Sequence, residues 1–138
     1  MLNRKEVHNS ETLNIQIDSH DQKSYLIELS KDCTKFDLNV ECLENSFSKF
    51  FILNHAESAC ELNINMVLKQ DANCQMGVLD LEKSPLKWNH YVDLKEQGAE
   101  YEILSGQLCQ EHIEKVCDME VRHNAPHTNG QMKNFAVL

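Results

Sequence analysis

The sequence predicts an all-β protein folded as a parallel β-helix, also called a β-solenoid. Apolar residues alternate with polar ones at period two through most of the chain, which is typical of strands with one buried face. The chain has only four glycines and two prolines, fewer than a series of tight hairpins usually needs. Gently bending coils therefore fit the composition better than hairpins do, and a β-sandwich is the alternative. The strands are predicted at even steps of 10 to 14 residues, with first inward residues near Leu13, Tyr25, Phe36, Phe50, Leu62, Met76, Leu86 and Ala99.

Each of these strands is justified by its own alternation. The pattern is clearest in residues 13–17, 36–40, 62–68, 86–94 and 99–103. After Val78 the phase changes, because Leu79 and Leu81 flank Asp80, and this indicates a bulge or bend. Asparagines beside the strands suit the corners of a coil, since Asn tolerates a left-handed backbone.

The length of 138 residues fits a single domain. Residues 1–12 are interpreted as a polar lead-in and residues 13–138 as the β-helix core. The chain ends on the apolar run 134–138, so we expect the solenoid to be incomplete at its C-terminus.

Charge and composition exclude several classes of partner. Thirteen Lys and Arg against 22 Asp and Glu leave a formal net charge of -9, which repels both nucleic acid and anionic membrane surfaces. No apolar stretch is long enough for a transmembrane helix, and the first twenty residues lack an apolar signal-peptide core. We therefore expect a cytoplasmic protein whose six cysteines are free and mostly buried.

Two histidines near the C-terminus are the most conspicuous candidates for chemistry. His123 and His127 lie four residues apart, a spacing that would pair them in a zinc site on a helix. Pro126 lies between them, and a strand precedes them, so we expect a turn between two strands instead. Cys109, His112 and Cys117 with His123 are weaker candidates for a soft-metal site, because their spacing is irregular. His90 is expected on a buried face, and Glu100 and Glu102 on a solvated one.

The C-terminal third resembles the SufB/SufD family of iron–sulfur assembly proteins. The resemblance covers about 50 residues well. It rests on the runs 86–94, 98–106, 118–128 and 131–138. The strands upstream, in residues 13–81, share only the general strand character of the family. The best-matching positions are Gly106, Asp118, His123, Pro126, Gln131 and Lys133.

The resemblance implies a right-handed parallel β-helix and a non-enzymatic scaffold role. It implies partnership with a SufB-like subunit and a SufC-like ABC-type ATPase, with the iron–sulfur cluster as the product of the complex and no cofactor held by this chain. It also implies that the chain is truncated relative to the family, since the ATPase-docking region would lie beyond Leu138. A SufB and a SufD role are both open, and a homodimer is a further expectation.

A small cupin-like metal-binding β-barrel enzyme is the alternative, with His123, His127 and Glu120 as ligands. Cupins show two Gly-rich histidine motifs, and a chain with four glycines does not contain them. The scaffold interpretation is therefore favoured.

Overall fold

The protein is a β-solenoid built from two parallel sheets that face each other. The computed structural model describes residues 2–110 and 112–137, and within them there are eleven strands and no helix. One sheet, called sheet A, contains β1 (Leu2–Val7), β3 (Gln22–Leu29), β5 (Phe47–Asn54), β7 (Asn73–Asp80), β9 (Glu100–Leu108) and β11 (Asn129–Val137). The other, sheet B, contains β2 (Ser10–Ile17), β4 (Lys35–Cys42), β6 (Cys60–Leu68), β8 (Leu86–Leu94) and β10 (Lys115–His123).

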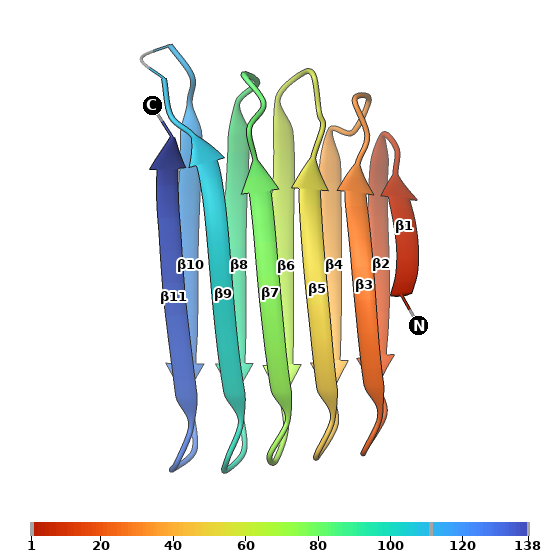
Figure 1. Cartoon of the computed structure of the whole chain (residues 1–138), viewed down its shortest axis with the longest axis vertical. Coiled ribbons are helices and arrows are strands. Elements are labelled where there is room, and N and C mark those ends of the chain that lie inside the picture. The colour runs from red at the N-terminus through yellow and green to blue at the C-terminus, as the bar shows by residue number, and fades with distance from the viewer. Residues whose placement is uncertain (1, 111, 138) are drawn as a thin grey trace.

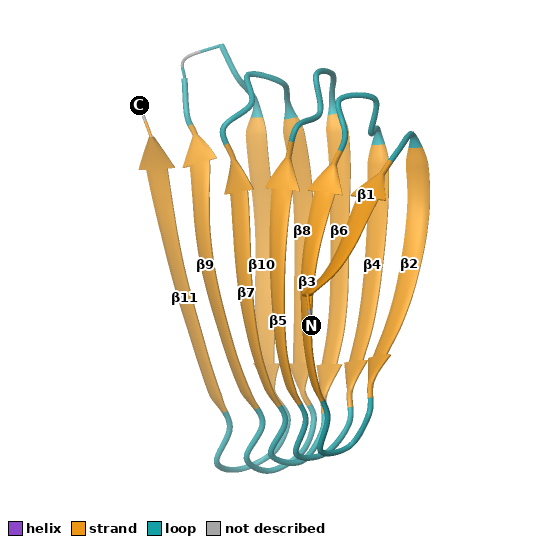
Figure 2. Cartoon of the chain, turned by 45° about the vertical axis from the view of Figure 1, so that its right-hand side comes forward, coloured by secondary structure: helices purple, strands orange, loops and turns teal. Residues whose placement is uncertain are grey.

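The chain passes from one sheet to the other with every strand, so that odd strands form sheet A and even strands sheet B. In Figure 1 the strands of sheet A point up in front, those of sheet B point down behind, and the chain advances from right to left. This winding is right-handed, and all nine strand pairs are parallel. Figure 2 shows that the loops gather at two corners, above and below the sheets. The predicted fold class is therefore confirmed, and the β-sandwich and the closed cupin-like barrel are not the fold.

The lower corners repeat one backbone device in each coil. His20, Asn45, Asp71 and His127 all have a positive φ, between 55° and 64°, and Gly98 takes the equivalent place with a φ of 80°. Successive corners are joined by backbone hydrogen bonds, for example from Asn45 N to Gln70 O at 2.9 Å. A left-handed residue at this position lets the chain turn from sheet B into sheet A within a short link.

The core lies between the two sheets and is filled by the inward positions of the predicted alternation. Phe36, Leu62 and Trp88 pair in register along sheet B, and all three are buried. In the last coil Cys117, Met119 and Val121 on β10 are only partly covered, and the inward Met132, Asn134 and Ala136 on β11 are exposed.

Two expectations from the sequence are wrong. Residues 2–7 form β1, which pairs with β3, and β2 begins at Ser10, so residues 2–12 of the expected lead-in belong to the coil. Its alternation is hidden because the inward face of β1 carries Lys5, which pairs with Glu11 at 3.0 Å. The phase also does not change near Asp80: this carboxylate is the inward residue, and Leu79 and Leu81 point outward.

Candidate functional site

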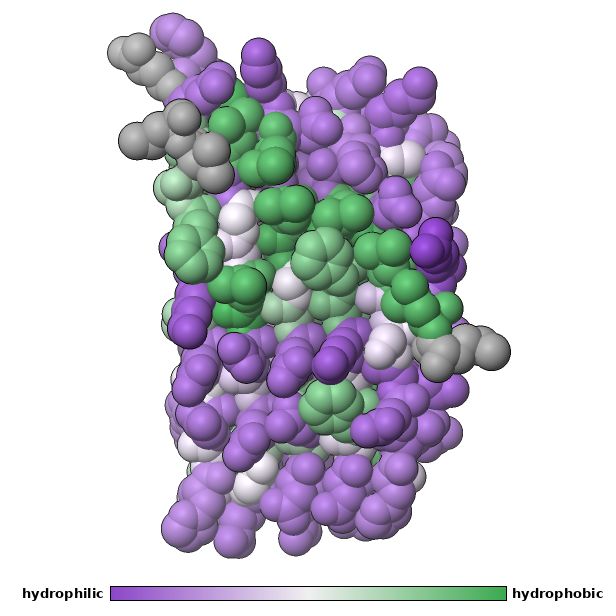
Figure 3. Space-filling model, viewed as in Figure 1, coloured by the Kyte–Doolittle hydropathy of each residue, from purple (hydrophilic) through white to green (hydrophobic). Residues whose placement is uncertain are grey.

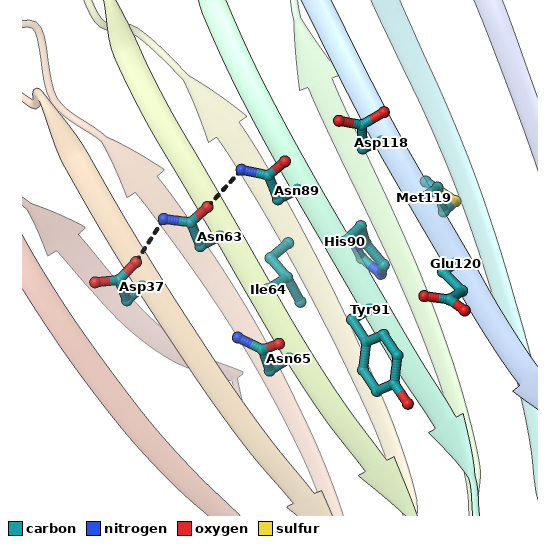
Figure 4. Close-up of a pocket in the computed structure, with 10 residues that line it drawn as sticks. All are labelled: Asp37, Asn63, Ile64, Asn65, Asn89, His90, Tyr91, Asp118, Met119 and Glu120. Atoms are coloured by element: carbon teal, nitrogen blue, oxygen red, sulfur yellow. Dashed lines mark hydrogen bonds between the residues drawn. The ribbon is translucent and has the colours of Figure 1, made fainter.

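The outer face of sheet B carries a row of stacked polar side chains. Asp37, Asn63, Asn89 and Asp118 occupy the same position on four neighbouring strands. The amide of Asn89 donates to Asn63 Oδ1 at 2.8 Å, and the amide of Asn63 donates to Asp37 Oδ1 at 2.7 Å (Figure 4). Asp118 has no N–H to donate to Asn89, so the ladder of amide hydrogen bonds stops between these two residues.

A second row runs beside the first. The amide of Asn65 donates to Asn39 Oδ1 at 3.4 Å, and that of Asn39 donates to Asn14 Oδ1 at 2.9 Å. Tyr91 and Glu120 follow at the same position on β8 and β10. Stacked amides of this kind reinforce a parallel sheet, because each rung bonds to the coil before it.

The two rows border a shallow hollow of about 520 Å³. Next to the hollow, Arg122 pairs with Glu120 at 2.7 Å and lies 5.6 Å from the centre of the Tyr91 ring. The groups offered to solvent are amides, carboxylates and one phenol. This face is therefore suited to hydrogen bonding, and no activated nucleophile lines the hollow.

A buried hydrogen-bonded triad lies directly beneath, inside the coil. Trp88 Nε1 donates to His90 Nδ1 at 3.1 Å, which places the proton of His90 on Nε2, 2.6 Å from the Tyr101 hydroxyl. Desolvation lowers the pKa of His90 to about 3 and raises that of Tyr101 well above its usual value. Both groups are neutral and sequestered from solvent, so the expected buried position of His90 is confirmed.

A buried ion pair, which the sequence did not suggest, joins the two sheets at the upper corner. Lys115 Nζ lies 2.8 Å from Asp80 Oδ2 and also donates to the carbonyls of Glu82 and Ser84. Asp80 accepts a further hydrogen bond from Asn54 at 3.0 Å. The sequence did contain an indication of this pair. Asp80 lies two residues after the inward Val78, and Lys115 lies two residues before the inward Cys117, so the alternation places both charged residues on inward faces.

The turn predicted between the two C-terminal histidines lies between β10 and β11. His123 ends β10, and its Nδ1 lies 2.7 Å from Thr128 Oγ1. His127 is the left-handed corner residue of this coil, equivalent to Asn45 and Asp71 in earlier coils. The backbone thus accounts for His127 without any ligand.

The six positions that carry the family resemblance do not form one site. Gly106, Gln131 and Lys133 lie on the outer face of sheet A, whereas Asp118 lies on the outer face of sheet B. His123 and Pro126 belong to the lower corner between the sheets. Their distribution over two faces and a corner fits contacts or coil geometry better than a single reaction centre.

The candidate metal ligands are not gathered either. In the described residues, no three of His, Cys, Asp and Glu lie close enough together to hold a metal ion. Desolvation raises the pKa of Cys117, and it raises that of the buried Cys60 to about 12. Burial therefore disfavours the thiolate, which is the form that binds metal. Cys109 and Cys117 are half-buried, and the other four cysteines are buried.

Comparisons with known proteins do not extend this description. No family model, no curated protein and no solved structure matches the chain. The described residues also contain no helix with the length and apolar character needed to cross a membrane.

Proposed function

We propose that this chain is a non-enzymatic scaffold subunit of the SufB/SufD type, acting in iron–sulfur cluster assembly in the cytoplasm. Its partners would be a SufB-like subunit and an ABC-type ATPase of the SufC kind. The cluster would be the product of the complex, and this chain would hold no cofactor of its own.

The observation that carries the proposal is the right-handed parallel β-helix. The family resemblance, drawn from residues 86–138, implies this fold, and the same residues form β8 to β11 of the solenoid. Resemblance and fold are separate observations, and their agreement supports the proposal.

The character of the surface gives further support. Both outer faces are open sheets bearing amide rows or apolar side chains, and the buried polar groups His90, Tyr101, Asp80 and Lys115 satisfy one another. Such surfaces are suited to contacts with other proteins. The cupin alternative is less well supported, because the strands of the described residues pair in parallel and His127 has a backbone role.

The test is co-purification. The tagged chain is co-expressed with the SufB-like protein and the ATPase of the same genome, and the complex is analysed by size exclusion. We expect the SufB-like subunit to co-elute with the chain, and the ATPase to join only through that subunit, because no residue of this chain is assigned to ATPase docking.

Variants sharpen the test. Asp118→Ala together with His123→Ala is expected to weaken retention of the SufB-like subunit. Gln16→Ala serves as the control, because Gln16 lies on β2, at the opposite edge of sheet B from β10. If the SufB-like protein elutes separately from the unmodified chain, the proposal is wrong.

A further inference from the structure

The outer face of sheet A has an apolar band that runs across most of the coils. Phe51 and Leu104 occupy the same position two coils apart, and they are 44% and 49% exposed. Leu53, Leu79 and Phe135 form the next row up, with Phe135 59% exposed. Figure 3 shows this band as the green area over the upper half of the face. Contiguous exposed apolar area of this kind marks an interaction surface.

Two glycines make the band flat. A Cβ at Gly77 would stand 2.6 Å from Cδ2 of Phe51, so the phenyl ring lies across the space that a side chain would fill. At Gly106 a Cβ would stand 3.2 Å from Cδ1 of Leu79. A flat sheet face packs well against another sheet face, in which the strands of the two sheets run nearly aligned.

The pattern of side chains around β7 is self-complementary. Lys49, Gln75 and Glu102 share one row, with Lys49 on β5, Glu102 on β9 and Gln75 between them on β7. In the rows above, Phe51 on β5 is matched by Leu104 on β9, and Leu53 by Gly106. Each of these three pairs therefore lies at equal distances on either side of β7. The first pair has opposite charges, the second is apolar, and the third combines a large residue with a small one.

We propose that this face binds the same face of a second copy of the chain, about a two-fold axis parallel to β7. That axis keeps each row at its height and exchanges β5 with β9. Lys49 of each copy then meets Glu102 of the other, and Phe51 meets Leu104. Gln75 meets its own equivalent on the axis, where two amides can exchange hydrogen bonds.

The opposite face of the molecule shows that this complementarity is not a general property of the solenoid. On sheet B the strand at the equivalent centre is β6, flanked by β4 and β8. A two-fold axis along β6 would bring Lys35 against Lys87, and Glu41 against Asp93. Like charges would meet at both positions, so the strands flanking β6 lack the charge complementarity that β5 and β9 have on sheet A.

The dimer is independent of the scaffold function proposed above, because it needs neither a SufB-like subunit nor an ATPase. Each copy carries a formal net charge of -9, so the two molecules repel each other at long range. Salt screens that repulsion, and the dimer is therefore expected to form more readily at physiological than at low ionic strength.

A charge exchange tests the proposal on the purified full chain by sedimentation equilibrium across a concentration series. Lys49→Glu and Glu102→Lys are each expected to raise the dimer Kd about tenfold, because two like-charged contacts replace two ion pairs. The double variant is expected to return the Kd to within about twofold of the original value.

Two controls separate this contact from net charge and from other modes of association. Lys87→Glu makes the same charge change on the sheet B face and should leave the Kd unchanged. Glu102→Lys reduces the net charge, so a dimer governed by overall repulsion would become stronger with it rather than weaker. A chain that stays monomeric at about 1 mM overturns the proposal. So does a dimer that is insensitive to both single changes, or one that the double change does not restore.

Discussion

At the scale of single residues, His90 makes the stability of the coil sensitive to acid. Its folded pKa is about 3, below the ordinary value of 6.5, because burial disfavours the charged ring. Protonation would also place a proton on Nδ1, where the indole N–H of Trp88 already points. The unfolded chain therefore takes up a proton that the folded chain refuses.

We expect the free energy of unfolding to fall as the pH decreases from about 6.5 towards 3. The loss caused by His90 should be about 2 kcal/mol by pH 5. The measurement is the free energy of unfolding in urea at pH 7 and at pH 5. His90→Phe should be less stable at pH 7, because two hydrogen bonds are lost, but should lose less stability on acidification. An equal loss in both proteins would show that other groups cause the acid sensitivity.

The ion pair between Lys115 and Asp80 gives a second prediction at this scale. Lys115→Met would leave the carboxylate of Asp80 buried without its cation and would also release two loop carbonyls. We expect a loss of about 3–5 kcal/mol in the free energy of unfolding. Adding Asp80→Asn should recover part of it, because the buried charge is then gone. A loss below about 1 kcal/mol for Lys115→Met would mean that the ion pair contributes little to the stability of the folded protein.

At the scale of the strands, the amide rows on sheet B join neighbouring coils. Asn63 takes part in two ladder hydrogen bonds, to Asp37 and from Asn89, whereas Asn14 takes part in one, from Asn39. We expect Asn63→Ala to cost about 1–2 kcal/mol of unfolding free energy and Asn14→Ala about half as much. Both changes replace one poor strand former by another, so propensity contributes little to the difference. Chemical denaturation of the two variants is the measurement, and equal costs would argue against a cooperative ladder.

At the scale of the whole molecule, the arrangement of ligand-type residues leads to a prediction about metal. We expect the chain, purified aerobically, to contain no stoichiometric zinc or iron, because the candidate ligands are spread over faces and corners. Elemental analysis of the purified protein is the measurement. About one ion per chain that disappears in the His123→Ala, His127→Ala double variant would show that the two residues bind metal after all.

The amino-acid sequence by itself determined most of the strands and their inward faces, and it favoured the parallel coil over a sandwich. Period-two alternation is a local property, because each side chain faces the core or solvent according to its own place along the strand. Trp88 and His90 could be placed inside for that reason. Even spacing with few turn residues then indicated stacked coils, and the turn around Pro126 followed from local backbone preference.

Only the tertiary structure decided which residues meet across coils. Lys115 and Asp80 are 35 residues apart, and their contact depends on the length of every link between them. Asp80 was misjudged because a lone carboxylate on a buried face is favourable only when its cation is present, and the sequence does not show that pairing. β1 was missed because its inward Lys5 is neutralised by Glu11 from the next strand. The amide rows and the self-complementary face around β7 likewise exist only once the strands are in register, because register places distant residues side by side.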